Sequence, residues 1–471
     1  MKSLFILLSA TILISGCISQ NVTEYPVTLN NTIPHDSIQE TAGIHNQEIT
    51  ETEDIQLIEN SALSRTHENL KRDGIDCSVE NTQDTKNSFV IDPKNSNIMY
   101  IGVESKGVFK STDSGISWKK SSNGIIAYPD ISNPEELCYP DMARIIIDPT
   151  NSQRLLLAPA DMSSGYVSWP YGETGGLWES IDAGQSWHQI LQDDINAAGT
   201  GAIAFDTTNA QTIYFGVNSD PPTFMEAPIK EPLNKLGVLY KTSDAGKTWE
   251  EIPTGVLTGT QATAFFIDPK NSNNIILMTQ SHDHIYQPDG SYIEAPIDEQ
   301  FGVLKSSDAG KTWTSFMESL PEDRRLIFDG DVAKNNFNNM IVRTFLFGPN
   351  VPSSVQQKSY YTTDGAETFE ETDVYIYVGR YNPHDPEGDH IIGYSPWYAE
   401  GDLVESTDAG KSWAPLNKPA EVDNVDIRIS NFVWDSENAN VIYASGTKEY
   451  LWKSEDSGKS WTTLLNIDTL P

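Results

Sequence analysis

An octapeptide of the pattern Ser/Thr-x-Asp-x-Gly-x-x-Trp recurs along the 471-residue chain and constrains the fold more than any other feature. Successive copies have their aspartates 44 to 69 residues apart, a spacing typical of propeller blades with variable insertions. The copy at 362–369 is degenerate, because its Gly is shifted by one position and Phe369 replaces the Trp. The aspartates of the seven copies are Asp113, Asp182, Asp244, Asp308, Asp364, Asp408 and Asp456.

A second recurring turn precedes most copies of the octapeptide. Asp92-Pro93-Lys94-Asn95 separates two short β-rich runs, 88–91 and 98–101, and is typical of a turn between two strands. Related turns begin at Asp148, Asp206, Asp268 and Asp435; the fifth unit keeps only Lys334-Asn335-Asn336 with Ala333 in the Asp position, and the sixth is predicted at Asp385-Pro386-Glu387-Gly388. Each unit then reads as four antiparallel strands, A to D. The chain is therefore predicted to be an all-β protein, a single seven-bladed β-propeller of four-stranded antiparallel blades.

The residue types of the octapeptide have a mechanical explanation. A tight hairpin needs Gly where the backbone turns to positive φ, and an Asp carboxylate can accept hydrogen bonds from backbone N–H groups of the turn. The Trp can pack against the sheet as strand D begins. Seven copies of one pattern indicate seven structural turns, so these aspartates are interpreted as structural rather than catalytic.

The first residues of the chain have the pattern of a targeting signal. Lys2 is followed by an apolar run at 4–14 that is too short to span a bilayer, and then by Ser15-Gly16-Cys17. This resembles a bacterial lipoprotein signal, in which cleavage leaves the cysteine to take a diacylglycerol. We expect a signal at 1–16, lipidation of Cys17, a disordered polar tether at 17–80 and the propeller at 81–471. The alternative is an ordinary secretory peptide; in both cases the mature protein is extracytoplasmic.

Two cysteines, Cys77 and Cys138, remain once Cys17 is set aside. In an oxidising compartment an even pair favours a disulfide, which would close a loop of about 60 residues and stabilise by roughly 3–4 kcal/mol. Two buried free thiols are the alternative.

The charge balance excludes one class of partner. The chain has 67 Asp and Glu against 31 Lys and Arg, a formal net charge of −36. Binding to phosphate backbones depends on Lys and Arg, so a nucleic-acid partner is excluded. The acidity favours a partner that is neutral, cationic or bridged by a metal ion.

Candidate binding residues lie in the long connections between predicted strands B and C, since loops of such length usually carry function or are disordered. These insertions span 160–176, 218–235, 280–300 and 395–402. They combine aromatic, carboxylate and imidazole groups, which suit either sugar stacking or peptide anchoring. The residues singled out are Tyr166, Trp169, Tyr171, His282, Asp283, His284, Tyr286, Trp397 and Tyr398.

Metal ligation has only weak support in the sequence. His282-Asp283-His284 and the stretch from His384 to His390 gather ligand types without a recognised spacing. We therefore predict no cofactor and no metal site, with calcium among surface carboxylates as the open alternative.

The octapeptides resemble the Asp-box, or bacterial neuraminidase repeat, shared by sialidases, xyloglucan hydrolases, sortilin and the photosystem II assembly factor. Sialidases use an arginine triad, for which Arg144, Arg343 and Arg428 are available on predicted strands, but the Phe-Arg-Ile-Pro signature is absent. In xyloglucan hydrolases one catalytic aspartate lies on the B–C loop of the first blade, which corresponds here to Glu104, and its partner lies on a second propeller. Sortilin adds cysteine-rich modules that three cysteines cannot build.

The photosystem assembly factor offers the best architectural match, a single propeller often made as a lipoprotein, although its basic patch contrasts with this acidic chain. The function expected is a lipid-anchored binding module for a protein or a glycan, without catalysis and as a monomer. Glycoside hydrolysis, with Glu104 as its weak catalytic candidate, is the alternative.

Overall fold

The computed structural model describes residues 88–470 except 104, 161–175, 192–197, 219–238, 254–259, 282–283, 287–291, 295–301, 322–325, 346–356, 397–401, 424–426, 448–449 and 467–469. The described part lies within one compact unit, His67–Pro471. Its sheets confirm the predicted fold class: seven four-stranded antiparallel sheets follow one another along the chain. The predicted boundaries at 16/17 and 80/81 lie outside the described residues.

The strands of each sheet are consecutive in sequence and ordered A, B, C, D. Blade 1 contains β1 (Ser88–Ile91), β2 (Met99–Val103), β3 (Gly107–Ser111) and β4 (Lys119–Lys120), and blade 2 contains β7 (Asp141–Ile147), β8 (Leu155–Ala160), β9 (Leu177–Ser180) and β10 (His188–Leu191). Blade 3 contains β11 (Ala198–Phe205), β12 (Ile213–Asn218), β13 (Leu239–Thr242) and β14 (Glu250–Ile252), and blade 4 contains β15 (Thr260–Ile267), β16 (Ile275–Ser281), β19 (Gly302–Ser306) and β20 (Thr314–Ser315).

Blade 5 contains β21 (Leu326–Val332), β22 (Met340–Phe345), β23 (Gln357–Thr362) and β24 (Glu370–Glu371). Blade 6 contains β25 (Val378–Tyr381), β26 (Ile391–Ser395), β27 (Asp402–Ser406) and β28 (Ala414–Leu416), and blade 7 contains β29 (Ile429–Trp434), β30 (Ile442–Gly446), β31 (Leu451–Ser454) and β32 (Thr462–Leu465). Two hairpins, β5 (Tyr128–Pro129) with β6 (Leu137–Cys138) and β17 (His284–Tyr286) with β18 (Tyr292–Glu294), and two 3-10 helices, η2 (Met317–Ser319) and η4 (Ala420–Asp423), lie in the connections.

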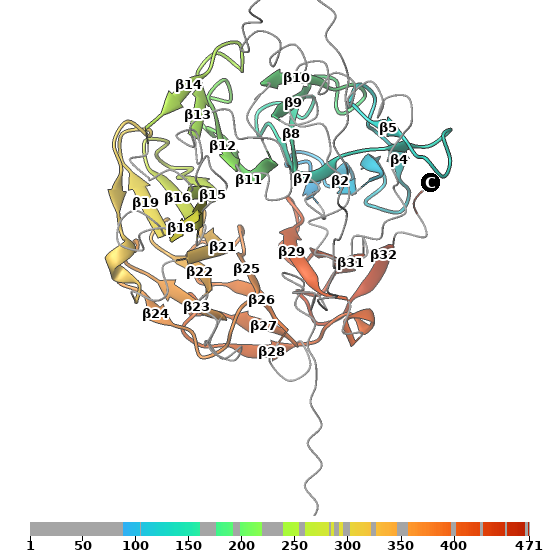
Figure 1. Ribbon diagram of the computed structural model, residues 1–471. Helices are drawn as coiled ribbons and strands as arrows, with labels where there is room; N and C mark the ends of the chain where they lie inside the picture. The colour runs from blue at the N-terminus through green and yellow to red at the C-terminus, as the bar shows by residue number, and fades with distance from the viewer. Residues whose placement is uncertain are drawn as a thin grey trace, which may run out of the picture. The chain divides into compact units, whose positions relative to one another are not determined.

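The first strands of the blades border the centre of the ring (Figure 1). Each contacts the first strand of the next blade, and β29 contacts β1, so the ring is closed. Among the residues that the structure describes, no blade borrows a strand from the other end of the chain. Closure instead depends on side chains of blades 1 and 7, where Phe89 and Met99 pack with Tyr443 and Leu451.

The hydrophobic core of the described residues is divided into seven clusters, one at each interface between neighbouring blades. Each octapeptide contributes its aromatic residue to the cluster shared with the preceding blade, so the Trp packs between blades as well as on its own sheet. Burial of a large apolar side chain stabilises a fold by roughly 1.5–3 kcal/mol, so these aromatic side chains help to hold neighbouring blades together. They are Trp118, Trp187, Trp249, Trp313, Phe369, Trp413 and Trp461.

Each octapeptide turn is held by the same hydrogen bonds. In blade 3, Thr242 Oγ1 donates to Asp244 Oδ1 at 2.7 Å and accepts from Gly246 N at 2.9 Å. Asp244 also accepts from the backbone N–H and the hydroxyl of Thr248, at 2.9 and 2.7 Å. Ala245 and Gly246 both have positive φ, of 64° and 89°, which explains the Gly of the pattern.

The degenerate fifth copy keeps this geometry. Gly365 and Ala366 take the two positive φ values, 77° and 74°, so Ala366 occupies the position that Gly has in the other copies. Ala366 N donates to Thr362 Oγ1 at 3.2 Å, as the Gly does elsewhere. The alanine is therefore held in a conformation that costs an L-residue about 1 kcal/mol or more.

The A–B turns and the octapeptide turns lie on one face, which we call the turn face. In every blade they are joined by a backbone hydrogen bond, such as Ser114 N to Asn97 O at 3.0 Å and Ala245 N to Gln211 O at 2.9 Å. The B–C and D–A connections consequently lie at the opposite strand ends, on what we call the loop face. Neighbouring A–B turns are also linked, for example Ser152 Oγ to Asp92 Oδ1 at 2.7 Å.

The A–B turn of blade 6 differs in register from the sequence prediction. It begins at Asn382, whose Oδ1 accepts from His384 N at 2.9 Å and whose backbone oxygen accepts from Asp385 N at 3.2 Å. The prediction of Asp385 as its first residue was therefore wrong by three positions. Asn382-Pro383 is the true counterpart of Asp92-Pro93, because an asparagine carbonyl accepts the same hydrogen bond as a carboxylate.

Cys138 is buried at the end of β6 and is disulfide-bonded. Cys77 and Cys17 lie outside the described residues, so the pairing of Cys77 with Cys138 stays a prediction. Within the described part of the chain, no helix has the length and apolar character to cross a membrane.

Candidate functional site

Most of the residues predicted for binding lie outside the described residues. These are Glu104, Tyr166, Trp169, Tyr171, His282, Asp283, Trp397 and Tyr398, together with the lipidation residue Cys17. His284 and Tyr286 lie on β17, which pairs with β18 through His284↔Glu294 and Tyr286↔Tyr292. The site built below comes from residues that the structure describes.

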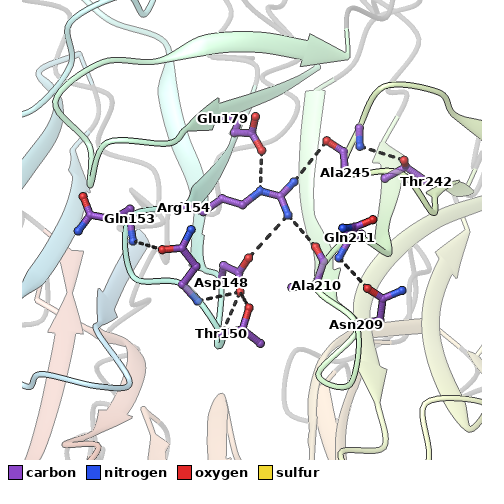
Figure 2. A network of polar contacts seen from close by, with 12 residues as sticks. Asp148, Thr150, Gln153, Arg154, Glu179, Asn209, Ala210, Gln211, Thr242 and Ala245 are labelled. Carbon is purple, nitrogen blue, oxygen red and sulfur yellow. Dashed lines mark hydrogen bonds and ion pairs between the residues drawn. The ribbon is translucent and has the colours of Figure 1, made fainter.

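A buried ion pair in blade 2 is the first candidate (Figure 2). Arg154 Nε donates to Glu179 Oε1 at 2.6 Å, with both side chains about 10% exposed. Its other nitrogens donate to two carbonyls of blade 3, Ala210 O at 2.6 Å and Ala245 O at 3.4 Å, and NH1 lies 3.7 Å from Asp148 Oδ2. Such buried charge is often a sign of function.

Comparison with the other blades assigns this ion pair a structural role. In blades 1, 3 and 4 the residue before the octapeptide is a lysine that donates to the corresponding carbonyl of the next blade. Lys110 donates to Ala183 O at 2.8 Å, Lys241 to Ala309 O at 3.3 Å and Lys305 to Gly365 O at 2.7 Å. In blade 2 that position is Glu179, and Arg154 supplies the missing cation.

Blade 6 repeats this exchange. Its corresponding residue is Glu405, and His390, at the same place before strand B as Arg154, lies with Nε2 2.8 Å from Glu405 Oε1. His390 Nδ1 lies 2.9 Å from Asn382 Nδ2, and His384 Nε2 lies 2.7 Å from Asp435 O of blade 7. The histidines and aspartates that the sequence crowded into 384–390 therefore form a turn and an inter-blade contact.

The centre of the ring holds a different kind of polar group. Arg380 of β25 donates to both carboxylate oxygens of Asp329 on β21, at 3.2 and 3.4 Å, and through Nε to Asn431 Oδ1 of β29 at 3.0 Å. Asp331 Oδ2 accepts from Tyr381 N at 2.7 Å. Arg380 thus joins blades 5, 6 and 7 through contacts that are not repeated between the other described blades.

These groups perturb one another. Burial works against the charge of Arg380, but Asp329 and Asp331 outweigh it and raise the pKa of the guanidinium. Burial raises the pKa of the Asp331 carboxyl, against the opposing influence of Arg380 and the Tyr381 N–H. Asp329 and Arg380 still reach solvent, with side chains 25% and 21% exposed.

Arg144 reaches the same centre from the opposite side of the ring. It lies on β7 of blade 2, yet the charges that act on it are those of Arg380, Asp329 and Asp331 in blades 5 and 6. Solvent reaches Arg144, although many protein atoms surround its guanidinium. This burial and the nearby charge of Arg380 lower the pKa of the guanidinium. No side chain that the structure describes forms a hydrogen bond or ion pair with it.

A second cluster lies where the loop face meets the ring centre. The Arg343 guanidinium stacks on the Tyr377 ring at 4.4 Å from its centroid, and Tyr375 OH donates to Gln357 Oε1. Burial raises the pKa of the Tyr375 hydroxyl, with Arg343 and Arg428 acting in the opposite direction. Arg428 itself is exposed. Half-buried aromatic rings beside cations are suited to holding a ligand.

The arginine triad considered from the sequence is only partly assembled. Arg343 and Arg428 share Tyr375 as a neighbour, whereas the charges acting on Arg144 come from Arg380, Asp329 and Asp331. Sequence analysis missed Arg380, Asp329 and Asp331. A signal was present for Asp331, because its position two residues before the A–B turn is apolar in five of the other blades, as Val90, Ile146, Ala204, Phe266 and Val433.

The described side chains also bear on metal ligation and on acid catalysis. Within that part of the chain, no group of three or more His, Cys, Asp or Glu residues could hold a metal ion. The two carboxylates of the ring centre are both engaged, Asp329 by Arg380 and Asp331 by the Tyr381 N–H. The arrangement is suited to binding polar groups.

Comparison with known proteins places this architecture in a class. No family model matches the chain. A xyloglucanase of Hypocrea jecorina (strain QM6a) is 20% identical over 351 residues, which cover 69% of this chain and 38% of that protein. The GH74 xyloglucanase from Xanthomonas campestris has a TM-score of 0.56 and 13% identity, covering 80% of this chain and 54% of its own. YCF48 from Cyanidioschyzon merolae has a TM-score of 0.44 and 12% identity, covering 78% and 95%.

The chain is a seven-bladed β-propeller structurally similar to the GH74 xyloglucanase from Xanthomonas campestris. It spans little more than half the length of the Xanthomonas enzyme and less than half of the Hypocrea enzyme. At these identities the likeness to solved structures establishes the fold alone.

Proposed function

We propose that this protein is an extracytoplasmic binding module that holds a protein or glycan ligand on its loop face without catalysis. The observation that carries the proposal is the cluster of Arg343, Tyr375, Tyr377 and Arg428, where two cations and two half-buried rings meet the ends of the inner strands. Tyr450 stacks on Trp452 at 5.3 Å beside the same cluster and adds a further ring. Aromatic and arginine side chains dominate binding energy at protein surfaces.

The ligand is tested by a glycan array and by affinity capture with the mature chain. Arg428→Gln and Tyr375→Phe are expected to weaken binding, because they remove an exposed cation and a hydroxyl at the cluster. Lys119→Gln, on the outermost strand of blade 1, is the matched control and is expected to bind normally. Unchanged ligand binding by both cluster variants would contradict the assignment of the binding site to this cluster.

Glycoside hydrolysis is the second candidate, favoured by the likeness to proteins named as xyloglucanases. Hydrolysis requires two carboxyl groups roughly 5–9.5 Å apart, one of them with a raised pKa. A polysaccharide screen that releases reducing sugar, with loss of that activity in Glu104→Gln, would establish the enzyme and overturn the non-catalytic proposal.

Membrane anchoring through Cys17 is also part of the proposal. Its support is the signal pattern at 1–16. Replacement of Cys17 by Ser is expected to release the protein from the membrane fraction. If Cys17→Ser stays membrane-associated and unmodified, the lipid anchor is wrong.

A further inference from the structure

One turn between blades 1 and 2 contains a reactive pair of residues. Asn123 and Gly124 follow β4 and are the only Asn-Gly pair in the sequence. Ile125 N donates to Ser122 O at 3.1 Å, and Gly124 has a φ of 93°, so residues 122–125 have the pattern of a type II turn with glycine at the third position. Asn123 and Gly124 are both exposed.

The neighbouring blade requires the glycine of this pair. A Cβ atom on residue 124 would lie 2.2 Å from Trp187 O, so a larger residue does not fit. Trp187 is the octapeptide tryptophan of blade 2; its backbone N donates to Asn123 O at 2.8 Å, and its Nε1 donates to Ser121 O at 2.7 Å. The contact between blades 1 and 2 therefore keeps a glycine directly after the asparagine.

The reacting groups of the pair are not held by hydrogen bonds. The side-chain amide of Asn123 and the backbone N–H of Gly124 form no hydrogen bond with any residue that the structure describes. Gly124 also has no Cβ atom to shield its nitrogen. The amide carbon of Asn123 and the nitrogen of Gly124 are therefore exposed and unhindered.

The asparagines of the A–B turns have the opposite arrangement. Asn95, Asn151 and Asn271 are each followed by serine, and each side-chain oxygen accepts from the backbone N–H two residues later, at 3.1, 3.1 and 3.3 Å. This hydrogen bond must break before the side chain can turn onto the next nitrogen, which the serine Cβ also crowds. The turns of the repeat thus protect their asparagines, whereas Asn123 lies outside them.

We propose that Asn123 is a site of spontaneous deamidation, which links the age of the protein to the contact between blades 1 and 2. The Gly124 nitrogen attacks Asn123 Cγ, so the N–Cγ bond forms, the Cγ–Nδ2 bond breaks, and ammonia leaves with the proton of the Gly124 N–H. Water then opens the cyclic imide at either carbonyl and gives aspartate or isoaspartate.

Isoaspartate changes the contact with blade 2. It adds one carbon to the main chain and moves the carbonyl that accepts from Trp187 N, so that this donor loses its acceptor. The site lies between blades 1 and 2, whereas the loop-face cluster belongs to blades 5 to 7. The inference therefore goes beyond the proposed binding function and does not depend on it.

The test is peptide mapping by mass spectrometry, with an assay for isoaspartate, on the folded protein kept at mildly alkaline pH. Asn123 is expected to deamidate several-fold faster than Asn95, Asn151 or Asn271. In denaturant the hydrogen bonds of the A–B turns are lost, so this advantage should shrink. Asn123→Gln is the matched control and should stay unmodified, because its longer side chain forms the imide ring far more slowly.

Melting temperatures test the effect on the blade contact. Aged protein that contains isoaspartate should melt at a lower temperature than fresh protein. Asn123→Asp adds the same charge but keeps the ordinary main chain, so it should melt closer to the fresh protein.

Each alternative result contradicts a defined part of the proposal. Absence of isoaspartate at residue 123, or equally fast deamidation of Asn95, Asn151 or Asn271 in the folded protein, would overturn the site. A ratio of rates that denaturant does not change would contradict protection by the A–B turns. If aged protein melts like fresh protein, the link to the blade contact is wrong, and if Asn123→Asp melts as low as aged protein, the role of the lengthened main chain is wrong.

Discussion

The turn face and the ring centre of this propeller are built in opposite ways. On the turn face the same hydrogen bonds recur in blade after blade, so Asp113 of blade 1 and Asp456 of blade 7 have equivalent surroundings. The ring centre is different, because the matching strand positions of the other blades hold no residue of the same charge as Arg144, Arg380, Asp329 or Asp331. Repetition therefore marks what the fold requires, and departure from the repeat marks where a function can be placed.

Blades 2 and 6 show how this criterion is applied to buried charge. Glu179 and Glu405 depart from the lysine of blades 1, 3 and 4, but each is matched by a base at one fixed position, Arg154 or His390. The compensated departure pairs each glutamate with a base, and in blade 2 it also restores the contact with the next blade, so it is structural. Arg144 has no such compensation among the described residues, which distinguishes it from Arg154.

The largest expected effect comes from breaking the compensated pair in blade 2. Arg154→Thr leaves Glu179 buried without its cation and should lower the free energy of unfolding by about 3–5 kcal/mol. The double variant Arg154→Thr/Glu179→Lys recreates the pattern of blade 3, Thr212 with Lys241, and should recover most of the loss. Chemical denaturation measures both. A double variant no more stable than the single one would contradict the equivalence of the two arrangements.

A smaller effect is expected from one hydroxyl of the repeated turn. Thr242→Val keeps the shape of the side chain but leaves Gly246 N without its acceptor, at an expected cost of about 1–3 kcal/mol in unfolding free energy. Thr248→Val, which removes the exposed hydroxyl on the other side of Asp244, is the matched control and should cost less. A larger loss in the control would mean that the buried hydroxyl does not organise the turn.

The degenerate fifth turn should respond differently from the sixth. Gly410→Ala places a side chain at a φ of 98° and should cost about 1–2 kcal/mol in unfolding free energy. Ala366→Gly relieves the same kind of strain but removes a buried methyl group, so its net change should stay within about 1 kcal/mol. Thermal melting measures the stability of both variants. If Ala366→Gly loses as much stability as Gly410→Ala, Ala366 is not strained.

The smallest effect concerns acid stability. Hydrogen bonds from the turn lower the pKa of Asp244, Asp308 and Asp456 from about 3.8 to about 2. Because the folded-state pKa lies below the unfolded one, this stabilisation is present above about pH 4 and is lost as the pH falls toward 2. The triple Asp→Asn variant should have a flatter stability profile between pH 4 and 2. An unchanged profile would show that these exposed carboxylates do not contribute.

The sequence predicted the fold because the information for it is local and repeated. The octapeptide and the Asp-Pro turn fix two of the three connections inside a blade, so strand order followed from them. The predicted register of the sixth turn was wrong because Asn382 stands in place of Asp, and an Asp-Pro pair begins three residues later. The ring centre was out of reach, since Arg144 and Arg380 meet there only after seven blades close.

The division between a structural turn face and a binding cluster on the loop face is tested most directly by measuring binding and melting on the same samples. Arg428→Gln should lose affinity for the ligand that the glycan array or affinity capture finds, while melting like the parent protein. Thr242→Val should melt at a lower temperature and, while folded, keep the parent affinity. If Arg428→Gln is destabilised with its affinity intact, or Thr242→Val loses ligand while folded, the division is wrong.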